Sequence, residues 1–305
     1  MPSWKEVNEE IQHAPSSIKA VRSKYLKIMN KYTGRNVIAY YSAFLQKSSI
    51  YQVAIDDGDK NAFMQAIYGL DRNKGLDLIL HTPGGNLAAT ESIVEYLKKM
   101  FNNDIRAFVP QIAMSAGTMI ALSAKEIIMG KQSNLGPIDP QFGGMSCAGI
   151  IEEFETACEE VKANPAMANI WGIIIGKYHP TFIGDCKKAI KWSEEIVSEW
   201  LKDNMFKNYR NKKHRVDNVM GFLSSHSETY SHQKHIHFDK LNELGLNVTP
   251  LENLDNRKID DCRDLQDCVL TLHHAYMQTF ANSDLVKIVE NQIPDGLSIT
   301  LAGKR

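Results

Sequence analysis

The strongest constraint on the fold lies between residues 76 and 110, where two nearly unbroken apolar segments flank a segment with helical periodicity. Two segments are apolar almost throughout, LDLILHT (residues 76–82) and IRAFVP (residues 105–110). Between them, apolar residues recur at helical spacing in AATESIVEYLKKMF (residues 88–101). Strands without polar alternation are typically covered on both faces, as the parallel strands of α/β proteins are. The sequence therefore predicts an α/β fold in which helices cover a parallel sheet.

The rest of the chain adds further strands and a largely helical second half. β-branched and aromatic residues predict strands at NVIAYYSAFL (residues 36–45) and SIYQVAI (residues 49–55). A short helix followed by a strand is predicted at HFDKLNELGLNV (residues 237–248), and one continuous helix is predicted over residues 262–290. Neither an internal repeat nor a low-complexity linker interrupts the 305 residues, which favours one continuous domain.

Composition argues against several classes of function. The 35 basic and 36 acidic residues nearly cancel, so no strong field attracts nucleic acid or an anionic membrane. No segment approaches the roughly 20 apolar residues of a membrane span, and the N-terminal segment lacks the apolar core of a signal peptide. We therefore expect a cytoplasmic protein that binds neither nucleic acid nor membranes. Reduced thiols fit this expectation, because no C-x-x-C pair occurs among Cys147, Cys158, Cys186, Cys262 and Cys268.

A serine lies among small residues where an apolar strand gives way to a helix. Ser115 stands in PQIAMSAGTMIALSA (residues 110–124) and is followed by Ala116. About 30 residues earlier, Gly84 and Gly85 leave the backbone bare before a helix, where main-chain N–H groups lack an intrahelical partner. A hydroxyl beside such donors suits acyl transfer, since the N–H groups can hold a developing oxyanion. Alternatively, Pro-Gly-Gly forms an ordinary turn and the serine is satisfied within its own helix.

A third segment of interest is the stiff loop KQSNLGPIDPQFGG (residues 131–144). Its two prolines and three glycines give it shape, and Asp139 is fixed between Ile138 and Pro140. One interpretation is an Asp-Pro turn that is stabilised by its own carboxylate. The other is that Asp139 orients a histidine, as the aspartate of a catalytic triad does.

These motifs resemble those of a known family. The motifs HTPGG, AMSAGTMIALSAKEIIMG and LGPIDP are similar to those of the serine dehydrogenase proteinases, a branch of the ClpP/crotonase superfamily related to the Clp protease proteolytic subunit and to signal peptide peptidase A. The resemblance extends over residues 34–250 through GRNVIAYYSAFL, YHPTFIGDCKKAIKW and SHQKHIHFDKLNELGL. It implies a ClpP/crotonase-like α/β fold of stacked β-β-α units with a helical C-terminal half.

The resemblance also implies how the chain is organised. A ClpP-like serine peptidase domain would occupy residues 34–250. An N-terminal helical segment would precede it over residues 1–33, and a C-terminal helical extension over residues 251–305 would pack on the same domain.

Roles for individual residues follow from the same resemblance. Ser115 falls at the nucleophile position of a serine-type endopeptidase, whereas Gly84, Gly85 and the N–H group of Ala116 fall at the oxyanion-binding positions. The Clp subunit has a histidine in the loop that here contains Asp139. The histidine of this chain must therefore come from elsewhere, and the branch carries a triad in the chain order serine, aspartate, histidine.

The identity of the general base is the least constrained part of the site. His232, within HSETYSHQKHIH, matches the histidine of the branch best. His179 lies in another segment shared with relatives, and signal peptide peptidases use a lysine base, which points to Lys177 here. A lysine base needs burial to lower its pKa. The other candidates are His226, His235, His237 and Lys125.

No cofactor is expected. The chain has neither a G-x-G-x-x-G motif after a strand nor a Walker phosphate loop, so any ATP hydrolysis would come from a separate ATPase or regulatory partner. The spacing of His232, His235 and His237 suits a metal ion, but no H-E-x-x-H motif or cysteine partner accompanies them, and we expect no metal. The resemblance implies a peptide or protein substrate and a homo-oligomer.

Two other functions are compatible with this fold. Acyl-CoA hydrolases and hydratases of the crotonase type use the oxyanion hole without a serine at this position. An inactive scaffold that binds a partner would keep the fold without the chemistry.

Overall fold

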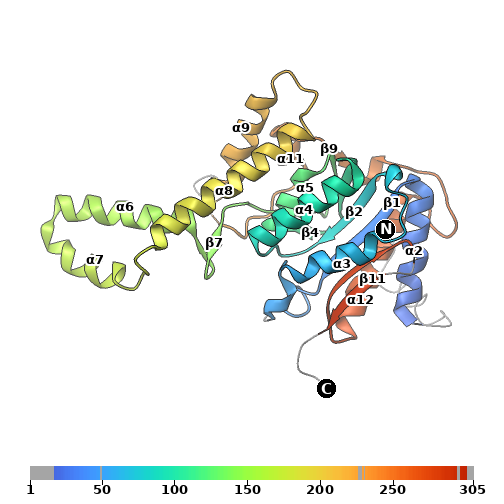
Figure 1. Ribbon diagram of the computed structural model, residues 1–305, viewed down its shortest axis with the longest axis horizontal. Coiled ribbons are helices and arrows are strands. Elements are labelled where there is room, and N and C mark those ends of the chain that lie inside the picture. Colours follow the sequence, from blue (N-terminus) through green and yellow to red (C-terminus); the bar gives the residue numbers. More distant parts are fainter. Residues whose placement is uncertain (1–16, 49, 226–228, 230, 294–295, 301–305) are drawn as a thin grey trace.

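The computed structural model of the protein describes residues 17–48, 50–225, 229, 231–293 and 296–300. Its centre is a seven-stranded sheet with the order β11-β10-β1-β2-β3-β5-β9 (Figure 1). The strands are β1 (Asn36–Ser42), β2 (Leu76–His81), β3 (Ile105–Val109), β5 (Glu126–Met129), β9 (Val248–Pro250), β10 (Leu285–Asn291) and β11 (Gly296–Thr300). Neighbouring strands from β1 to β9 are parallel, and β10 is antiparallel to both of its neighbours. The predicted mixed α/β fold with a mostly parallel sheet is confirmed.

Helices cover both faces of the sheet, which explains why most residues of its central strands are apolar. Along β2, Leu78 and Leu80 pack into one core, whereas Ile79 packs into the other. The first face is covered by α3 (Gly58–Ile67), α4 (Leu87–Phe101), α5 (Ala116–Ser123) and the second half of α8 (Phe182–Asp203), and the second face by α2 (Ser17–Thr33) and α12 (Leu265–Ala281).

Short strands follow two of the main strands, and the first of them completes a β-β-α unit. Strand β4 (Ile112–Ala113) follows β3 and leads directly into α5. It pairs in parallel with β6 (Asn134–Leu135), which follows β5. A separate hairpin is formed by β7 (Gln141–Phe142) and β8 (Met145–Ser146).

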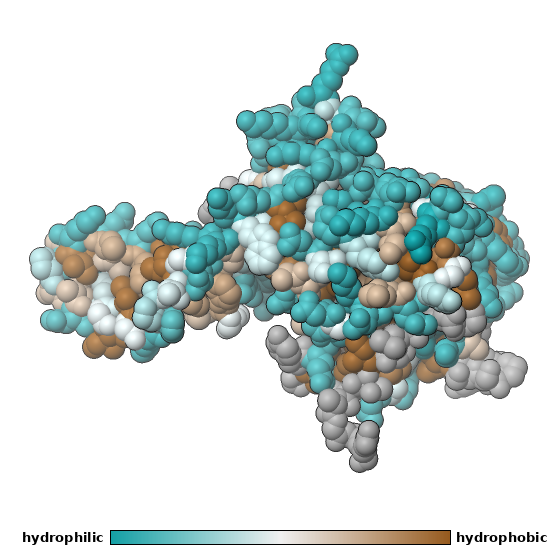
Figure 2. Space-filling view, viewed as in Figure 1, coloured by the Kyte–Doolittle hydropathy of each residue, from teal (hydrophilic) through white to brown (hydrophobic). Residues whose placement is uncertain are grey.

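A helical arm extends away from the sheet (Figure 1). It contains α6 (Cys147–Ala163), η3 (Pro165–Met167), α7 (Ala168–Ile175) and the first half of α8. None of the α7 residues is buried, and apolar surface is visible on the arm in Figure 2. In the ranges that the structure describes, no helix combines the length and the apolar character that a membrane crossing requires. The remaining elements are η1 (Tyr51–Val53), η2 (Arg72–Lys74), α9 (Lys212–Leu223), α11 (Phe238–Glu243) and η4 (Leu251–Asn253).

Two segments differ from the sequence-based predictions. The strand predicted over residues 49–55 is a 3-10 turn with a single bridge at Ile55, because the Val53 N–H group bonds back to the Ile50 carbonyl. The helix predicted over residues 262–290 ends at Ala281.

The second difference changes the expected organisation of the C-terminal region. The polar residues Asn282, Ser283 and Asp284 interrupt the helix, and the β-branched residues that follow form β10 against β1. The region of residues 251–305 is therefore not only helical, since β10 and β11 join the central sheet. Of the expected N-terminal helical segment, residues 17–33 form α2, whereas residues 1–16 lie outside the described residues.

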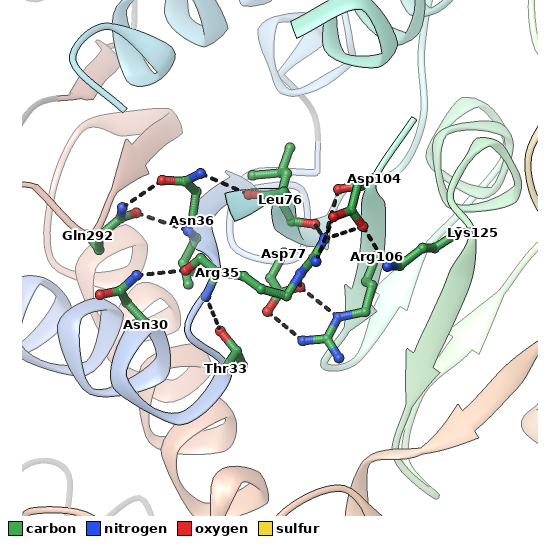
Figure 3. Close-up of polar contacts among 12 residues, drawn as sticks. Asn30, Thr33, Arg35, Asn36, Leu76, Asp77, Asp104, Arg106, Lys125 and Gln292 are labelled. Carbon is green, nitrogen blue, oxygen red and sulfur yellow. Dashed lines mark hydrogen bonds and ion pairs between the residues drawn. The ribbon is translucent and has the colours of Figure 1, made fainter. Parts of the chain in front are cut away.

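Charged side chains join the starts of the parallel strands β1, β2 and β3 (Figure 3). The Asp77 carboxylate is fully buried and accepts from Arg35 at 2.8 Å and from Arg106 at 2.8 and 2.7 Å. Arg35 also pairs with Asp104 at 2.9 Å. Two guanidinium groups therefore bind one buried carboxylate, at the end of β2 away from the Pro-Gly-Gly segment.

Candidate active site

Four short segments lie side by side beyond the ends of β2, β3 and β5. Thr82 forms a parallel bridge with Ala113, Ala113 pairs in parallel with Leu135, and Leu135 forms an antiparallel bridge with Ile236. The last bridge has both of its hydrogen bonds, at 3.0 and 2.9 Å. The first three segments are parallel and the fourth is antiparallel to them. The residues that follow each of the first three segments and the residues that precede the fourth therefore lie at the same edge.

This edge collects the residues that the sequence singled out. Gly84 and Gly85 follow the first segment, and Ser115 follows the second. Asp139 follows the third, and His232 precedes the fourth. The topology of the chain thus gathers residues that are far apart in sequence, whereas their catalytic roles stay predictions.

Ser115 occupies a strained turn between β4 and α5. Its φ is 53° and its ψ is −118°, a conformation that residues with a side chain rarely adopt. Such strain costs about 1–3 kcal/mol and clusters at functional sites. The helix begins directly afterwards, with a 3.0 Å hydrogen bond from the Met119 N–H group to the Ser115 carbonyl. The half-buried Ser115 side chain does not cap this helix and has no hydrogen-bond partner among the described residues.

Small residues around Ser115 allow two backbone segments to approach closely. A Cβ atom at Gly117 would lie 2.5 Å from the Thr82 methyl group. A Cβ atom at Gly84 would lie 2.7 Å from the Ser115 Cβ atom and 2.9 Å from the Ala116 nitrogen, and its φ of +97° also favours glycine. The Pro-Gly-Gly segment therefore does more than reverse the chain, because its first glycine lets the main chain lie against the serine.

Some main-chain N–H groups in this region have no acceptor among the described residues. The Gly84 N–H group is already used, since it donates to the Thr82 hydroxyl at 3.2 Å. Within the described ranges, the N–H groups of Gly85 and Ala116 have no acceptor. The Ala116 group is the first N–H of α5, where the helix dipole adds partial positive charge. These two donors suit an oxyanion on an adduct of Ser115, and Gly84 contributes by its shape.

A buried aspartate is hydrogen-bonded to a histidine at the same edge. The His232 Nδ1 atom lies 2.7 Å from Asp139 Oδ1. The Asp139 side chain is 2% exposed, and its second oxygen has no hydrogen-bond partner in the part of the chain that is described. A 3.0 Å hydrogen bond from the Ile138 N–H group to the Leu223 carbonyl holds the loop. Beside an ionised carboxylate, which only accepts, this contact requires the proton on Nδ1; in the neutral imidazole Nε2 is then an acceptor, as in a general base.

Three of the other candidate bases, His179, Lys177 and Lys125, lie away from the four paired segments. His179 and Lys177 are exposed between α7 and α8, where the His179 Nδ1 atom lies 3.3 Å from the Thr181 hydroxyl. An exposed lysine lacks the burial that a lysine base requires. Lys125 pairs with Asp104 at 2.5 Å, beyond the end of α5 that is farther from the serine.

The histidines considered for a metal ion do not form a site. His232 contacts Asp139, whereas His235 and His237 are exposed. No group of three or more His, Cys, Asp or Glu side chains in the described ranges could hold a metal ion. His226, another candidate base, lies outside the described residues.

Two contacts around the site were not predicted from the sequence. The Thr118 hydroxyl donates to the Ala113 carbonyl at 2.9 Å and accepts from the Gly136 N–H group at 2.9 Å, which ties β4 to the loop that carries the aspartate. Ile55 forms a parallel bridge with Gly85. A threonine within an apolar helix is a sequence signal for a hydroxyl hydrogen bond such as that of Thr118. No local sequence pattern predicts the bridge between Ile55 and Gly85.

The fold and the site define a class of protein. A mostly parallel sheet with helices on both faces, a β-β-α unit and a strained serine against a bare glycine segment are features of ClpP/crotonase-like α/β proteins. Residues 14–257 match the family model of the ClpP-like SDH-type serine proteinases, and the chain belongs to this family.

Two curated relatives come from Methanocaldococcus jannaschii. Uncharacterized protein MJ1495 is 34% identical over 196 residues, which cover 64% of this chain and 59% of the relative. Uncharacterized protein MJ0137 is 31% identical over 196 residues, which cover 64% of this chain and 60% of the relative. The chain thus spans about three fifths of the length of these relatives.

Proposed function

We propose that the protein is a serine peptidase whose nucleophile is Ser115. As the hydroxyl oxygen attacks the carbonyl carbon of a peptide bond, His232 Nε2 takes its proton, and Asp139 stabilises the resulting imidazolium. The tetrahedral oxygen accepts hydrogen bonds from the N–H groups of Gly85 and Ala116. His232 then protonates the leaving amine, and water hydrolyses the acyl-enzyme by the same proton transfers.

One combination of features supports this proposal most strongly. The backbone of Ser115 is strained, its hydroxyl has no partner among the described residues, and unpaired N–H groups lie in the same turn and in the adjoining glycine segment. The Asp139–His232 pair lies at the same edge of the four paired segments as Ser115. A serine that served only packing would not require the strain.

We also propose a peptide or protein substrate and an assembly of several copies. The apolar surface of α7 supports assembly, because Ile170 and Ile173 are 53% and 70% exposed on the projecting arm. A separate ATPase or regulatory partner would supply any unfolding of protein substrates. A cytoplasmic location is supported by the cysteines, since all five are free and four of them are buried.

A fluorophosphonate probe tests the proposed nucleophile. The probe is incubated with the protein, and the modified residue is mapped by tandem mass spectrometry. We expect modification at Ser115, none in Ser115→Ala, and at least about 100-fold slower modification in His232→Ala, as for loss of a general base. His179→Ala and Lys177→Ala are the matched controls, and both are expected to react at the wild-type rate.

Other results would contradict the proposal and point to the alternatives. Labelling that survives Ser115→Ala would exclude this serine as the nucleophile. A crotonase-type enzyme predicts turnover of an acyl-CoA thioester that Ser115→Ala leaves intact. An inactive scaffold predicts neither labelling nor turnover.

A further inference from the structure

A lysine is buried beside the segment that contacts Pro-Gly-Gly. The Lys287 side chain, on β10, is 1% exposed, and its ammonium lies 2.8 Å from Asp59 Oδ1 and 2.9 Å from Asp59 Oδ2. It also donates to the Asp56 carboxylate at 2.8 Å and to the Ala54 carbonyl at 3.1 Å. Asp59 is fully buried and accepts a further hydrogen bond from the Tyr40 hydroxyl at 2.9 Å. The three protons of the ammonium are therefore all used.

This ion cluster holds the chain on both sides of Ile55. Lys287 binds the Ala54 carbonyl, which belongs to the peptide group before Ile55. The Asp59 carboxylate accepts from the Asp56 N–H group at 3.0 Å, which belongs to the peptide group after Ile55. The cluster thus fixes the two peptide planes that flank this residue.

Fixing those planes also fixes the Gly84–Gly85 peptide group. The C=O and N–H of a trans peptide point in opposite directions, so the N–H and C=O groups of Ile55 point away from the ion cluster. The N–H group donates to the Gly84 carbonyl at 2.8 Å, and the C=O group accepts from the Asn86 N–H group at 2.9 Å. By the same rule, the Gly84 carbonyl that faces Ile55 leaves the Gly85 N–H group facing the opposite way.

The chain at Ile55 lies too close to Gly85 for residue 85 to carry a side chain. A Cβ atom at Gly85 would collide with the backbone of Ile55. The second glycine of Pro-Gly-Gly is therefore required by Ile55, whereas the first is required by Ser115.

We propose that Lys287 and Asp59 are positioning residues that direct the Gly85 N–H group towards the oxyanion, acting through Ile55. The inference rests on the proposed function, because this direction affects the reaction only if Ser115 forms a tetrahedral adduct. Lys287 and Asp59 bond the two peptide groups that flank Ile55 at 3.1 and 3.0 Å, and the Ile55 N–H group bonds the Gly84 carbonyl at 2.8 Å.

The energetics of buried charge support a geometric role. Desolvation offsets much of the attraction in a buried ion pair, so apolar residues of similar volume often stabilise a fold equally well. Burial raises the pKa of Asp59, and the Lys287 charge opposes that rise. An apolar pair could not bond the Ala54 carbonyl and the Asp56 N–H group, which are the contacts that orient Ile55.

The matched test compares Asp59→Asn with Asp77→Asn. Both carboxylates are fully buried and paired with cationic side chains, so each variant loses one buried negative charge. Asp77 lies near the start of β2, whereas Asp59 belongs to the cluster that holds Ile55 (Figure 3 shows the Asp77 network). Only Asp59→Asn is therefore expected to disturb the glycine segment.

Hydrogen–deuterium exchange and probe labelling give two independent readouts. In Asp59→Asn, the Ile55 and Asn86 amides are expected to exchange at least about tenfold faster than in wild type. In Asp77→Asn, the same two amides are expected to exchange at the wild-type rate. The maximal rate of fluorophosphonate labelling is expected to fall between about tenfold and about 1000-fold in Asp59→Asn, where the upper limit is loss of one oxyanion donor. The probe concentration for half-maximal rate is expected to stay the same.

The outcomes separate this inference from the proposed function. Equal exchange in Asp59→Asn and Asp77→Asn would overturn the inference, and so would a wild-type labelling rate in Asp59→Asn. Selectively faster exchange with no labelling of the wild-type protein would support the link from Lys287 to the glycine segment and contradict only the proposed nucleophile. If Asp59→Asn does not fold, Asp56→Asn, whose carboxylate is 47% exposed, is expected to give the same pattern at smaller amplitude.

Discussion

Gly84→Ala tests the close contact between the Pro-Gly-Gly segment and the candidate nucleophile. The added Cβ atom would lie 2.7 Å from both the Met114 carbonyl oxygen and the Ser115 Cβ atom, and 2.9 Å from the Ala116 nitrogen. Cβ atoms in proteins essentially never approach other atoms below 3.0 Å. The main chain at residue 84 or at residue 115 must therefore move.

Gly34→Ala is the matched control for the size of the destabilisation in Gly84→Ala. Gly34 also has a positive φ, of +66°, but a Cβ atom added there would have no other atom within 4 Å. Backbone strain of about 1–3 kcal/mol applies to both variants, and overpacking adds about 1–3 kcal/mol to Gly84→Ala only. We expect the free energy of unfolding to fall by about 2–6 kcal/mol in Gly84→Ala and by about 1–3 kcal/mol in Gly34→Ala.

Labelling measures the functional consequence of the same displacement. In folded Gly84→Ala, fluorophosphonate labelling of Ser115 is expected to fall at least about 100-fold, as for loss of one oxyanion donor. Gly34→Ala is expected to react at the wild-type rate. Urea titration followed by circular dichroism gives the unfolding free energies. Equal stability and equal labelling in the two variants would refute the close contact.

Other parts of the molecule give independent tests. Burial lowers the pKa of His81 to about 3, so this imidazole is neutral in the folded protein, whereas in the unfolded chain it takes up a proton below its ordinary pKa of about 6.5. The stability that the neutral His81 contributes is therefore complete above about pH 6.5 and is lost as the pH falls towards 3. Between pH 7 and pH 4.5, the free energy of unfolding in urea titrations is expected to fall by about 3 kcal/mol less in His81→Phe than in wild type. An identical pH dependence of the two proteins would contradict this burial. Asp139→Asn removes the acceptor of the His232 Nδ1 proton and is expected to slow labelling of Ser115 at least about 100-fold, while a wild-type rate would remove Asp139 from the site. Ile173→Glu places a charge on exposed α7 and is expected to reduce the assembly mass in sedimentation velocity, whereas an unchanged mass would exclude this surface as the interface.

The central sheet was predictable because its signals are local. The strands β2 and β3 pack into cores on both faces, as their nearly unbroken apolar sequences indicate. The strand predicted over residues 49–55 was wrong, because a local turn and one bridge at Ile55 replace it. The helix predicted over residues 262–290 was too long, because helical spacing alone does not reveal the polar break at Asn282.

The candidate site was predictable only in part. Ser115 and the glycines stood out because close approach of two main chains requires small residues. The pairing of Asp139 with His232 came from the resemblance alone, since no spacing rule connects side chains that are 93 positions apart. Lys287 and Asp59 are 228 positions apart, and only the antiparallel pairing of β10 brings them together.

The most direct measurement of the central claim is a crystal structure of the fluorophosphonate adduct. We predict a bond from Ser115 Oγ to phosphorus, with the phosphonyl oxygen within about 3 Å of the Gly85 and Ala116 nitrogens. An adduct on another residue, or a phosphonyl oxygen that turns away from both nitrogens, would contradict the account.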